Sequence, residues 1–144
     1  MREILFHGKR IDNGEWFEGS LILAGECSIL GMDWPYLNIR VISDTIGQYI
    51  GRQDKNGKKI FEGHIVEHAG KLYVIEYIEK YSRFAPTRPE IVFAGFDLGA
   101  CEIVGDIHDH PDLLQAVFPK RLQALSVQER QRVFLGKWGK GDTP

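Results

Sequence analysis

The four residues Asp54–Gly57 lie between two apolar segments and predict a tight reversal of the chain. Ile46–Ile50 precedes them and Ile60–Val66 follows, so two strands can pair on either side of the turn. Asn56 and Gly57 tolerate the positive φ angles that tight turns require. This stretch contains no nucleophile, phosphate-binding loop or complete metal-ligand set. It therefore predicts a β-hairpin and indicates an architecture rather than an activity.

Short apolar runs separated by turn residues recur on both sides of this hairpin. Leu37–Ile42 alternates apolar and polar residues as a half-buried strand does. Leu72–Ile78 is almost wholly apolar, as in a central strand or a strand bent within a small barrel. Ala69-Gly70 predicts a two-residue turn. Gly25–Tyr36 has no clear period and is interpreted as an irregular loop or lid with one partly buried aromatic residue. Ser82–Pro89 carries two prolines and is interpreted as a loop that cannot continue a ladder. The other strand candidates are Ile4–Phe6, Trp16-Phe17, Ser20–Leu23, Ile91–Ala94 and Cys101–Ile107.

From His110 onward the chain changes to helical patterns. Pro111 suits the first position of a helix, and apolar residues recur at helical spacing until Pro119. Ser126 with Glu129 forms a capping-box pattern that predicts a second helix. Many short strands followed by two helices favour a small antiparallel β-barrel or a strongly bent sheet with short C-terminal helices.

Charge is distributed unevenly along the 144 residues. The net charge is −2, yet residues 119–144 carry six basic and two acidic side chains. Two cysteines 74 positions apart predict no disulfide framework. Met1–Arg10 contains no long apolar run that would indicate a secretory signal. No run of 18 apolar residues is present to form a spanning helix, so the cytoplasm is the expected compartment.

The basic C-terminal segment is the best candidate for nucleic-acid contact, because cations and aromatic rings alternate along it. The competing interpretation is that its apolar residues dock on the barrel or on another subunit. The slightly acidic pI of about 6.2 argues against a dedicated nucleic-acid-binding domain. The candidate residues are Lys120, Arg121, Arg130, Arg132, Lys137 and Trp138.

Four histidines are the candidates for a metal site. His64 and His68 would share one face of a strand, as would His108 and His110, and two such pairs on neighbouring strands could converge on zinc or another transition metal. The competing interpretation is that these are surface or turn histidines, with Asp109 or His110 capping the helix at Pro111. No catalytic residue and no cofactor is predicted.

Three segments together resemble the YopX family, whose members are encoded mainly by phages and prophages. They are Met1–Phe6, the central stretch from Gly47 to Val66, and Glu102–Leu114. The resemblance implies an all-β core of the SH3-like small-barrel kind and self-association, and it implies no established activity. His64 departs from the family pattern, which commonly has aspartate after the glycine, so any role of that carboxylate is not carried over. The tail after Pro119 lies outside the resemblance.

These observations predict a YopX-like barrel domain over residues 1–118 and a basic helical tail over residues 119–144. The leading hypothesis is a non-catalytic, phage- or prophage-derived protein of the host bacterial cytoplasm. It would form homo-oligomers and act through contacts with a host or phage protein, without binding membranes. A nucleic-acid-binding accessory protein that uses the basic tail is the alternative, and a histidine-based metalloenzyme is the third hypothesis.

Overall fold

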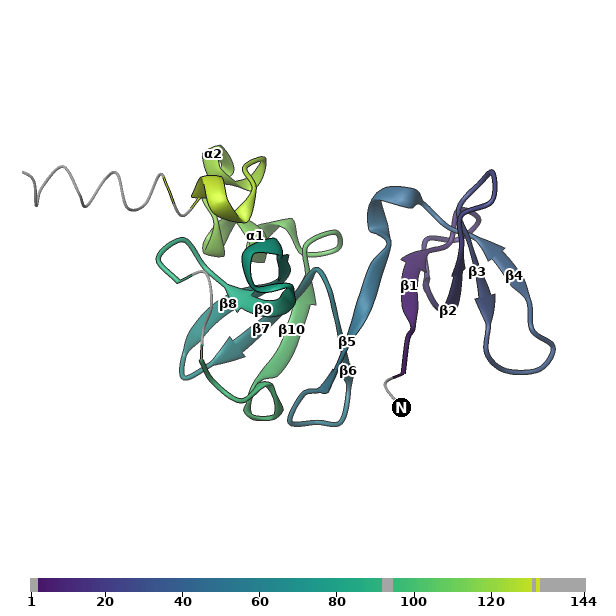
Figure 1. Cartoon of the computed structure of the whole chain (residues 1–144), viewed down its shortest axis with the longest axis horizontal. Helices are drawn as coiled ribbons and strands as arrows, with labels where there is room; N and C mark the ends of the chain where they lie inside the picture. The colour runs from purple at the N-terminus through teal and green to yellow at the C-terminus, as the bar shows by residue number, and fades with distance from the viewer. Residues whose placement is uncertain (1–2, 92–94, 131, 133–144) are drawn as a thin grey trace, which may run out of the picture. The chain divides into compact units, whose positions relative to one another are not determined.

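The computed structural model describes residues 3–91, 95–130 and 132 (Figure 1). The described residues are mainly β-structure, arranged in two antiparallel sheets with short helices. Within these residues neither sheet closes into a barrel. They divide into two compact units. The first contains the residues up to Gln53 together with Lys59–Glu62, and the second contains Asp54–Lys58 and the described residues from Gly63 onward.

The first unit is a six-stranded sheet with the order β4-β3-β2-β1-β5-β6. Leu5, Tyr49 and Phe61 form a buried cluster in this unit, and the ring of His7 stacks on Phe61 with the centroids 4.0 Å apart. A single-turn 3-10 helix, Ser43–Thr45, precedes β5. The strands are β1 (Phe6–Lys9), β2 (Trp16–Ile22), β3 (Ser28–Gly31), β4 (Asn38–Arg40), β5 (Gly47–Gln53) and β6 (Lys59–Phe61).

The interpretation of Gly25–Tyr36 as an irregular loop is wrong for its middle part, because β3 lies there. Ile29 in this strand is fully buried, and β3 pairs with β2 on one side and β4 on the other. Pairing on both sides stabilises a strand whose own sequence shows no alternation. Close backbone approach also contributes, since a Cβ added to Gly19 of β2 would lie 2.0 Å from the Leu30 carbonyl oxygen.

The hairpin predicted at residues 54–57 is confirmed. Gly57 has a φ of 79°, and its N–H donates to the Asp54 carbonyl at 3.0 Å. β5 and β6 pair on either side of the turn, with Tyr49 opposite Phe61. The side chain of Asp54 is only 5% exposed, and its carboxylate accepts backbone N–H groups from Asn56, Lys58 and Ile103 at 2.9, 2.9 and 3.0 Å.

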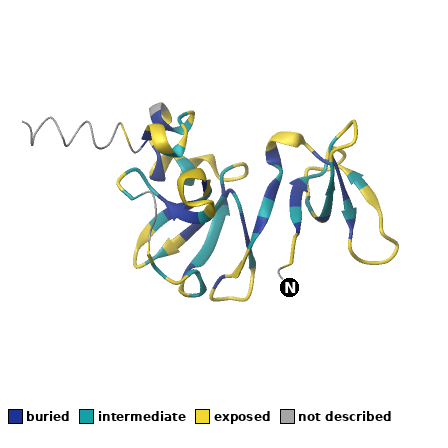
Figure 2. Ribbon diagram, in the orientation of Figure 1, coloured by how far each residue is buried: buried dark blue, intermediate teal, exposed yellow. Residues whose placement is uncertain are grey.

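The second unit is a four-stranded sheet with the order β10-β7-β8-β9. The predicted central strand is confirmed as β8, in which Tyr73, Val74, Ile75 and Ile78 are buried (Figure 2). The turn at Ala69-Gly70 is confirmed as well, with φ angles of 51° and 79°. The strands are β7 (His64–His68), β8 (Lys71–Ile78), β9 (Arg83–Thr87) and β10 (Glu102–Asp106).

The prediction that Ser82–Pro89 cannot continue a ladder is wrong. β9 lies within this segment, and Pro86 pairs with Ile75 of β8. Proline is tolerated there because β9 is an outer strand of the described sheet, where a missing N–H breaks no ladder bond on the outer side. For the strand candidate Ile91–Ala94, only Ile91 is described, in an isolated bridge with Arg88, and the other residues lie outside the described part of the chain.

Short helices complete the second unit. The first predicted helix is confirmed as α1 (Pro111–Val117), and α2 (Lys120–Gln123) follows it. The capping box is confirmed, with the Glu129 N–H 3.1 Å from Ser126 Oγ and the Ser126 N–H 3.3 Å from the Glu129 carboxylate; residues 127–130 are helical. Single 3-10 turns span Glu79–Tyr81 and Leu98–Ala100. The buried helical residues pack on the sheet in one core of Ile65, Val74, Val117, Phe118 and Leu122.

Candidate protein-binding surface

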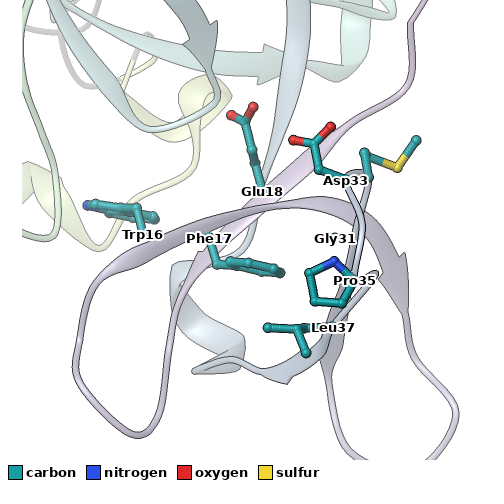
Figure 3. Close-up of a pocket in the computed structure, with 8 residues that line it drawn as sticks. Trp16, Phe17, Glu18, Gly31, Asp33, Pro35 and Leu37 are labelled. Carbon is teal, nitrogen blue, oxygen red and sulfur yellow. The ribbon is translucent and has the colours of Figure 1, made fainter.

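A pocket of about 350 Å³ lies in the first unit, formed by β2, β3 and the loop that joins β3 to β4. Figure 3 shows the Phe17 ring beside Pro35 and Leu37, with the carboxylates of Glu18 and Asp33 to one side of them. The pocket is thus apolar on its walls and acidic at its rim. Its lining residues are Trp16, Phe17, Glu18, Gly31, Met32, Asp33, Pro35 and Leu37.

The local sequence explains how the pocket forms. Gly31 leaves room for the Phe17 ring, because an added Cβ would lie 3.0 Å from Phe17 Cζ. The loop is tied back by two backbone hydrogen bonds, from Gly31 N to Leu37 O at 2.8 Å and from Tyr36 N to Asp33 O at 2.7 Å. Tyr36 has a φ of 54°, a left-handed conformation that costs a non-glycine residue about 1–2 kcal/mol. Strain of this kind is often found at binding sites.

The residues of the same loop are exposed (Figure 2), and several of them have large apolar side chains. Trp34 is 82% exposed and meets Tyr36 edge to face, with the ring centroids 5.8 Å apart. The expectation of a partly buried aromatic residue in this segment is therefore wrong, because both of its aromatic side chains face solvent. We call this loop and its pocket the 32–37 surface. Its exposed apolar members are Met32, Trp34, Tyr36 and Leu37.

Neighbouring side chains hold the rim of the pocket in place. Trp16 stacks on the buried ring of His7, with the centroids 4.2 Å apart. Lys59 Nζ lies 3.4 Å from Glu18 Oε1, and attraction to this carboxylate raises the pKa of Lys59. The rim is therefore anchored on the sheet, while the loop extends from it.

The four candidate metal ligands lie in different local environments. His68 stacks on Phe96 with the centroids 4.0 Å apart, whereas His108 is exposed in the turn after β10. His110 accepts the Asp106 N–H at Nδ1, at 3.2 Å, and precedes α1 without a side-chain cap bond. His108 and His110 thus lie in a turn and not on a strand. In the described part of the chain, no three His, Cys, Asp or Glu side chains are grouped so that they could hold a metal ion.

His64 is the candidate ligand whose environment is most unusual. It pairs with Asp106 across β7 and β10. Burial lowers the pKa of His64 to about 4, and the nearby carboxylates of Asp106 and Asp54 oppose this shift. The imidazole is therefore neutral in the folded protein at neutral pH.

This pKa predicts that the protein loses stability in mild acid. As the pH falls below about 6.5, His64 of the unfolded chain binds a proton that the folded protein does not, so the free energy of unfolding falls until about pH 4. The loss from this residue amounts to as much as about 3 kcal/mol. Urea unfolding of wild type and His64→Gln at several pH values measures it. Parallel stability curves for the two proteins between pH 6.5 and 4 would contradict the prediction.

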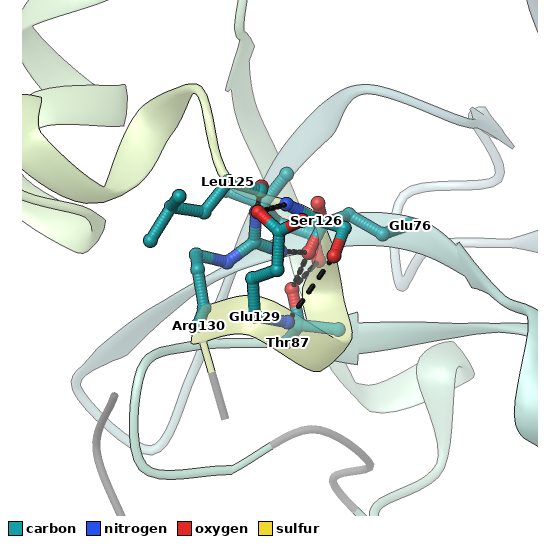
Figure 4. Close-up of polar contacts among 7 residues, drawn as sticks. Glu76, Thr87, Leu125, Ser126, Glu129 and Arg130 are labelled. Carbon is teal, nitrogen blue, oxygen red and sulfur yellow. Dashed lines mark hydrogen bonds and ion pairs between the residues drawn. The ribbon is translucent and has the colours of Figure 1, made fainter. Parts of the chain in front are cut away.

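The candidate nucleic-acid ligands are also placed differently from one another. Lys120 and Arg132 are exposed, whereas Arg130 is 6% exposed. The Arg130 guanidinium donates to the Glu76 carboxylate and, at 2.7 Å, to the Leu125 carbonyl (Figure 4). It also lies over the Phe118 ring, 4.2 Å from the centroid. Arg130 thus contributes to the interior of the second unit. The side chain of Arg121, together with Lys137 and Trp138, lies outside the described residues.

Two antiparallel sheets with short helices and an exposed apolar loop define a mainly β protein. Residues 14–115 match the family model described as YopX protein, so the chain belongs to the YopX family. No curated protein sequence matches it. The fold is similar to that of protein EF1440 from Enterococcus faecalis, with 22% sequence identity and a TM-score of 0.51. That similarity covers 79% of this chain and 99% of EF1440.

Among the described helices, none has the length and apolar character needed to cross a membrane.

Proposed function

We propose that this protein is a non-catalytic member of the YopX family, of phage or prophage origin, that self-associates through the 32–37 surface. It acts by protein contacts in the cytoplasm of the host bacterial cell, and a host or phage protein binds the assembled form. The partner that binds at this surface is a second copy of the same chain.

The exposure of Trp34 is the observation that carries this proposal. Burying a tryptophan removes about 150–250 Å² from water, which favours association by on the order of 5 kcal/mol before the entropic cost of association. Met32, Tyr36 and Leu37 are each more than half exposed in the same loop. Aromatic and methionine side chains are enriched at protein interfaces, whereas an apolar patch on a monomer is usually small.

The second unit is proposed to be an SH3-like small barrel. The order of its strands supports this proposal. β7 lies between β8 and β10, so the first and last strands of this sheet in the chain, β7 and β10, are neighbours. Pairing of early and late strands is how a sheet begins to close on itself.

Replacing Trp34 with serine is expected to weaken self-association at least tenfold, because truncation of a central interface tryptophan costs about 2 kcal/mol or more. Light scattering over a range of concentrations would measure this as a mass that falls toward the 16.4 kDa monomer. Tyr81→Ser is the matched control, since Tyr81 is 52% exposed and lies in the second unit. A monomeric wild-type protein, or equal masses for wild type and Trp34→Ser, would overturn the proposal.

A further inference from the structure

We infer that the pocket of the 32–37 surface binds the C-terminal segment, residues 133–144, of a second copy of the chain. This inference rests on the proposed self-association and names the part of the partner copy that enters the pocket. The segment lies outside the described residues, and its amino-acid composition is the property that matches the pocket.

The chemistry of the pocket specifies its occupant. The walls are the apolar side chains of Phe17, Pro35 and Leu37, and the rim carries the carboxylates of Glu18 and Asp33. A volume of about 350 Å³ is at the small end of ligand pockets and suits one or two side chains better than a large cofactor. The matching ligand is an aromatic side chain beside a cation, because the Asp33 carboxylate favours positive charge, whereas the Glu18 carboxylate already pairs with Lys59.

The C-terminal segment has this composition. Trp138 follows Lys137 directly, and Lys140 lies two residues later. Phe134 adds a second aromatic side chain, and Asp142 is the one acidic residue between 133 and 144. Tryptophan is one of the residues enriched among the side chains that contribute most to binding at interfaces, and the adjacent lysine supplies the charge that the rim of the pocket attracts.

The length of the segment allows it to reach another molecule. Twelve residues follow Arg132, and an extended chain of twelve residues spans at most about 40 Å. A contact between this segment and the pocket of another copy is heterologous, because pocket and segment are different surfaces. Heterologous contacts build rings or open chains of subunits.

Trp138→Ser in the chain of 144 residues tests the inference, with Thr143→Ala as the control in the same segment. Analytical ultracentrifugation is expected to show self-association weakened at least tenfold by Trp138→Ser and unchanged by Thr143→Ala. If Trp34→Ser weakens association while Trp138→Ser leaves it at the wild-type level, the inference is overturned and the proposed self-association stands. If neither variant changes it, both are overturned.

A charge exchange tests the contact itself. Asp33→Lys is expected to weaken association at least tenfold by placing like charges together, and adding Lys137→Asp in the same chain is expected to restore most of the loss. Asp12→Lys is the control, because Asp12 is an exposed carboxylate of the first unit that does not line the pocket. Circular dichroism checks that each variant is folded. If the loss of association free energy in the double variant equals the sum of the losses in the two single variants, a contact between Asp33 and Lys137 is overturned.

Discussion

Replacing Arg130 with methionine is expected to lower the free energy of unfolding by about 3–5 kcal/mol, the range found when one partner of a buried ion pair is removed. The side chains of Arg130 and Glu76 are 7% and 24% exposed. Without the guanidinium, the Glu76 carboxylate stays largely buried and keeps its hydrogen bond with the Thr87 hydroxyl, which does not neutralise its charge (Figure 4). The Leu125 carbonyl would also lose a donor. Unfolding in guanidinium chloride measures this loss of stability.

Arg132→Met is the matched control for this variant. Arg132 lies two residues further along and is exposed, so its replacement is expected to change stability by no more than about 0.5 kcal/mol. The double variant Glu76→Met/Arg130→Met should be more stable than Arg130→Met alone, because replacing both charges leaves neither one buried. An Arg130→Met protein within about 1 kcal/mol of wild type, the cost of an ordinary substitution, would show that the pair is not a buried one.

Asp54→Ala is expected to destabilise the protein by about 3 kcal/mol, because it leaves three backbone N–H groups without their acceptor. One carboxylate oxygen accepts from Asn56 and Lys58, and the other accepts from Ile103. Asp54→Asn distinguishes the contributions of the two carboxylate oxygens. The asparagine keeps one acceptor for the turn but turns an amide nitrogen toward the Ile103 N–H, so we expect an intermediate loss. Urea unfolding distinguishes the three proteins.

The stabilisation that Asp54 contributes in the wild-type protein depends on pH with a definite sign. Burial by itself would raise the pKa of Asp54, but the hydrogen bonds from Ile103, Lys58 and Asn56 together lower it. The stabilisation is therefore present at neutral pH and is lost as the pH falls through the lowered pKa of the folded protein. Asp12→Ala, at an exposed turn position, should cost far less than Asp54→Ala. Equal losses for the two variants would contradict the role of Asp54.

Local chemistry was enough to predict several elements. The turn at Asn56-Gly57, the turn at Ala69-Gly70 and the capping box at Ser126 each depend on residues that are neighbours in the sequence. The two missed strands depend on distant partners. β3 is held by β2 and β4, and β9 tolerates Pro86 because of its place in the sheet order. Neither condition can be recognised in the segment itself.

The candidate site was harder to predict for a related reason. Met32, Trp34 and Tyr36 are apolar, and composition alone does not show whether such residues form a core or an exposed surface. The sequence signal for this surface was weak. It consisted of a tryptophan and a methionine near Pro35, in a segment without a clear period. The histidine pairs were identified by spacing, which does not determine whether two pairs converge. The metal and nucleic-acid hypotheses remain predictions, as does the division of the chain at residue 118.

The burial of Arg130 also limits how strongly salt could weaken nucleic-acid binding by the basic tail. Residues 119–144 carry six basic side chains, and one of them is already neutralised by Glu76. Each phosphate that a protein neutralises releases counterions and contributes about −0.9 to the slope of log affinity against log salt concentration for duplex DNA. With five cations left, that slope cannot exceed about −4.5 in magnitude if the tail alone makes the contacts. A steeper dependence on ionic strength would require cations from elsewhere in the chain.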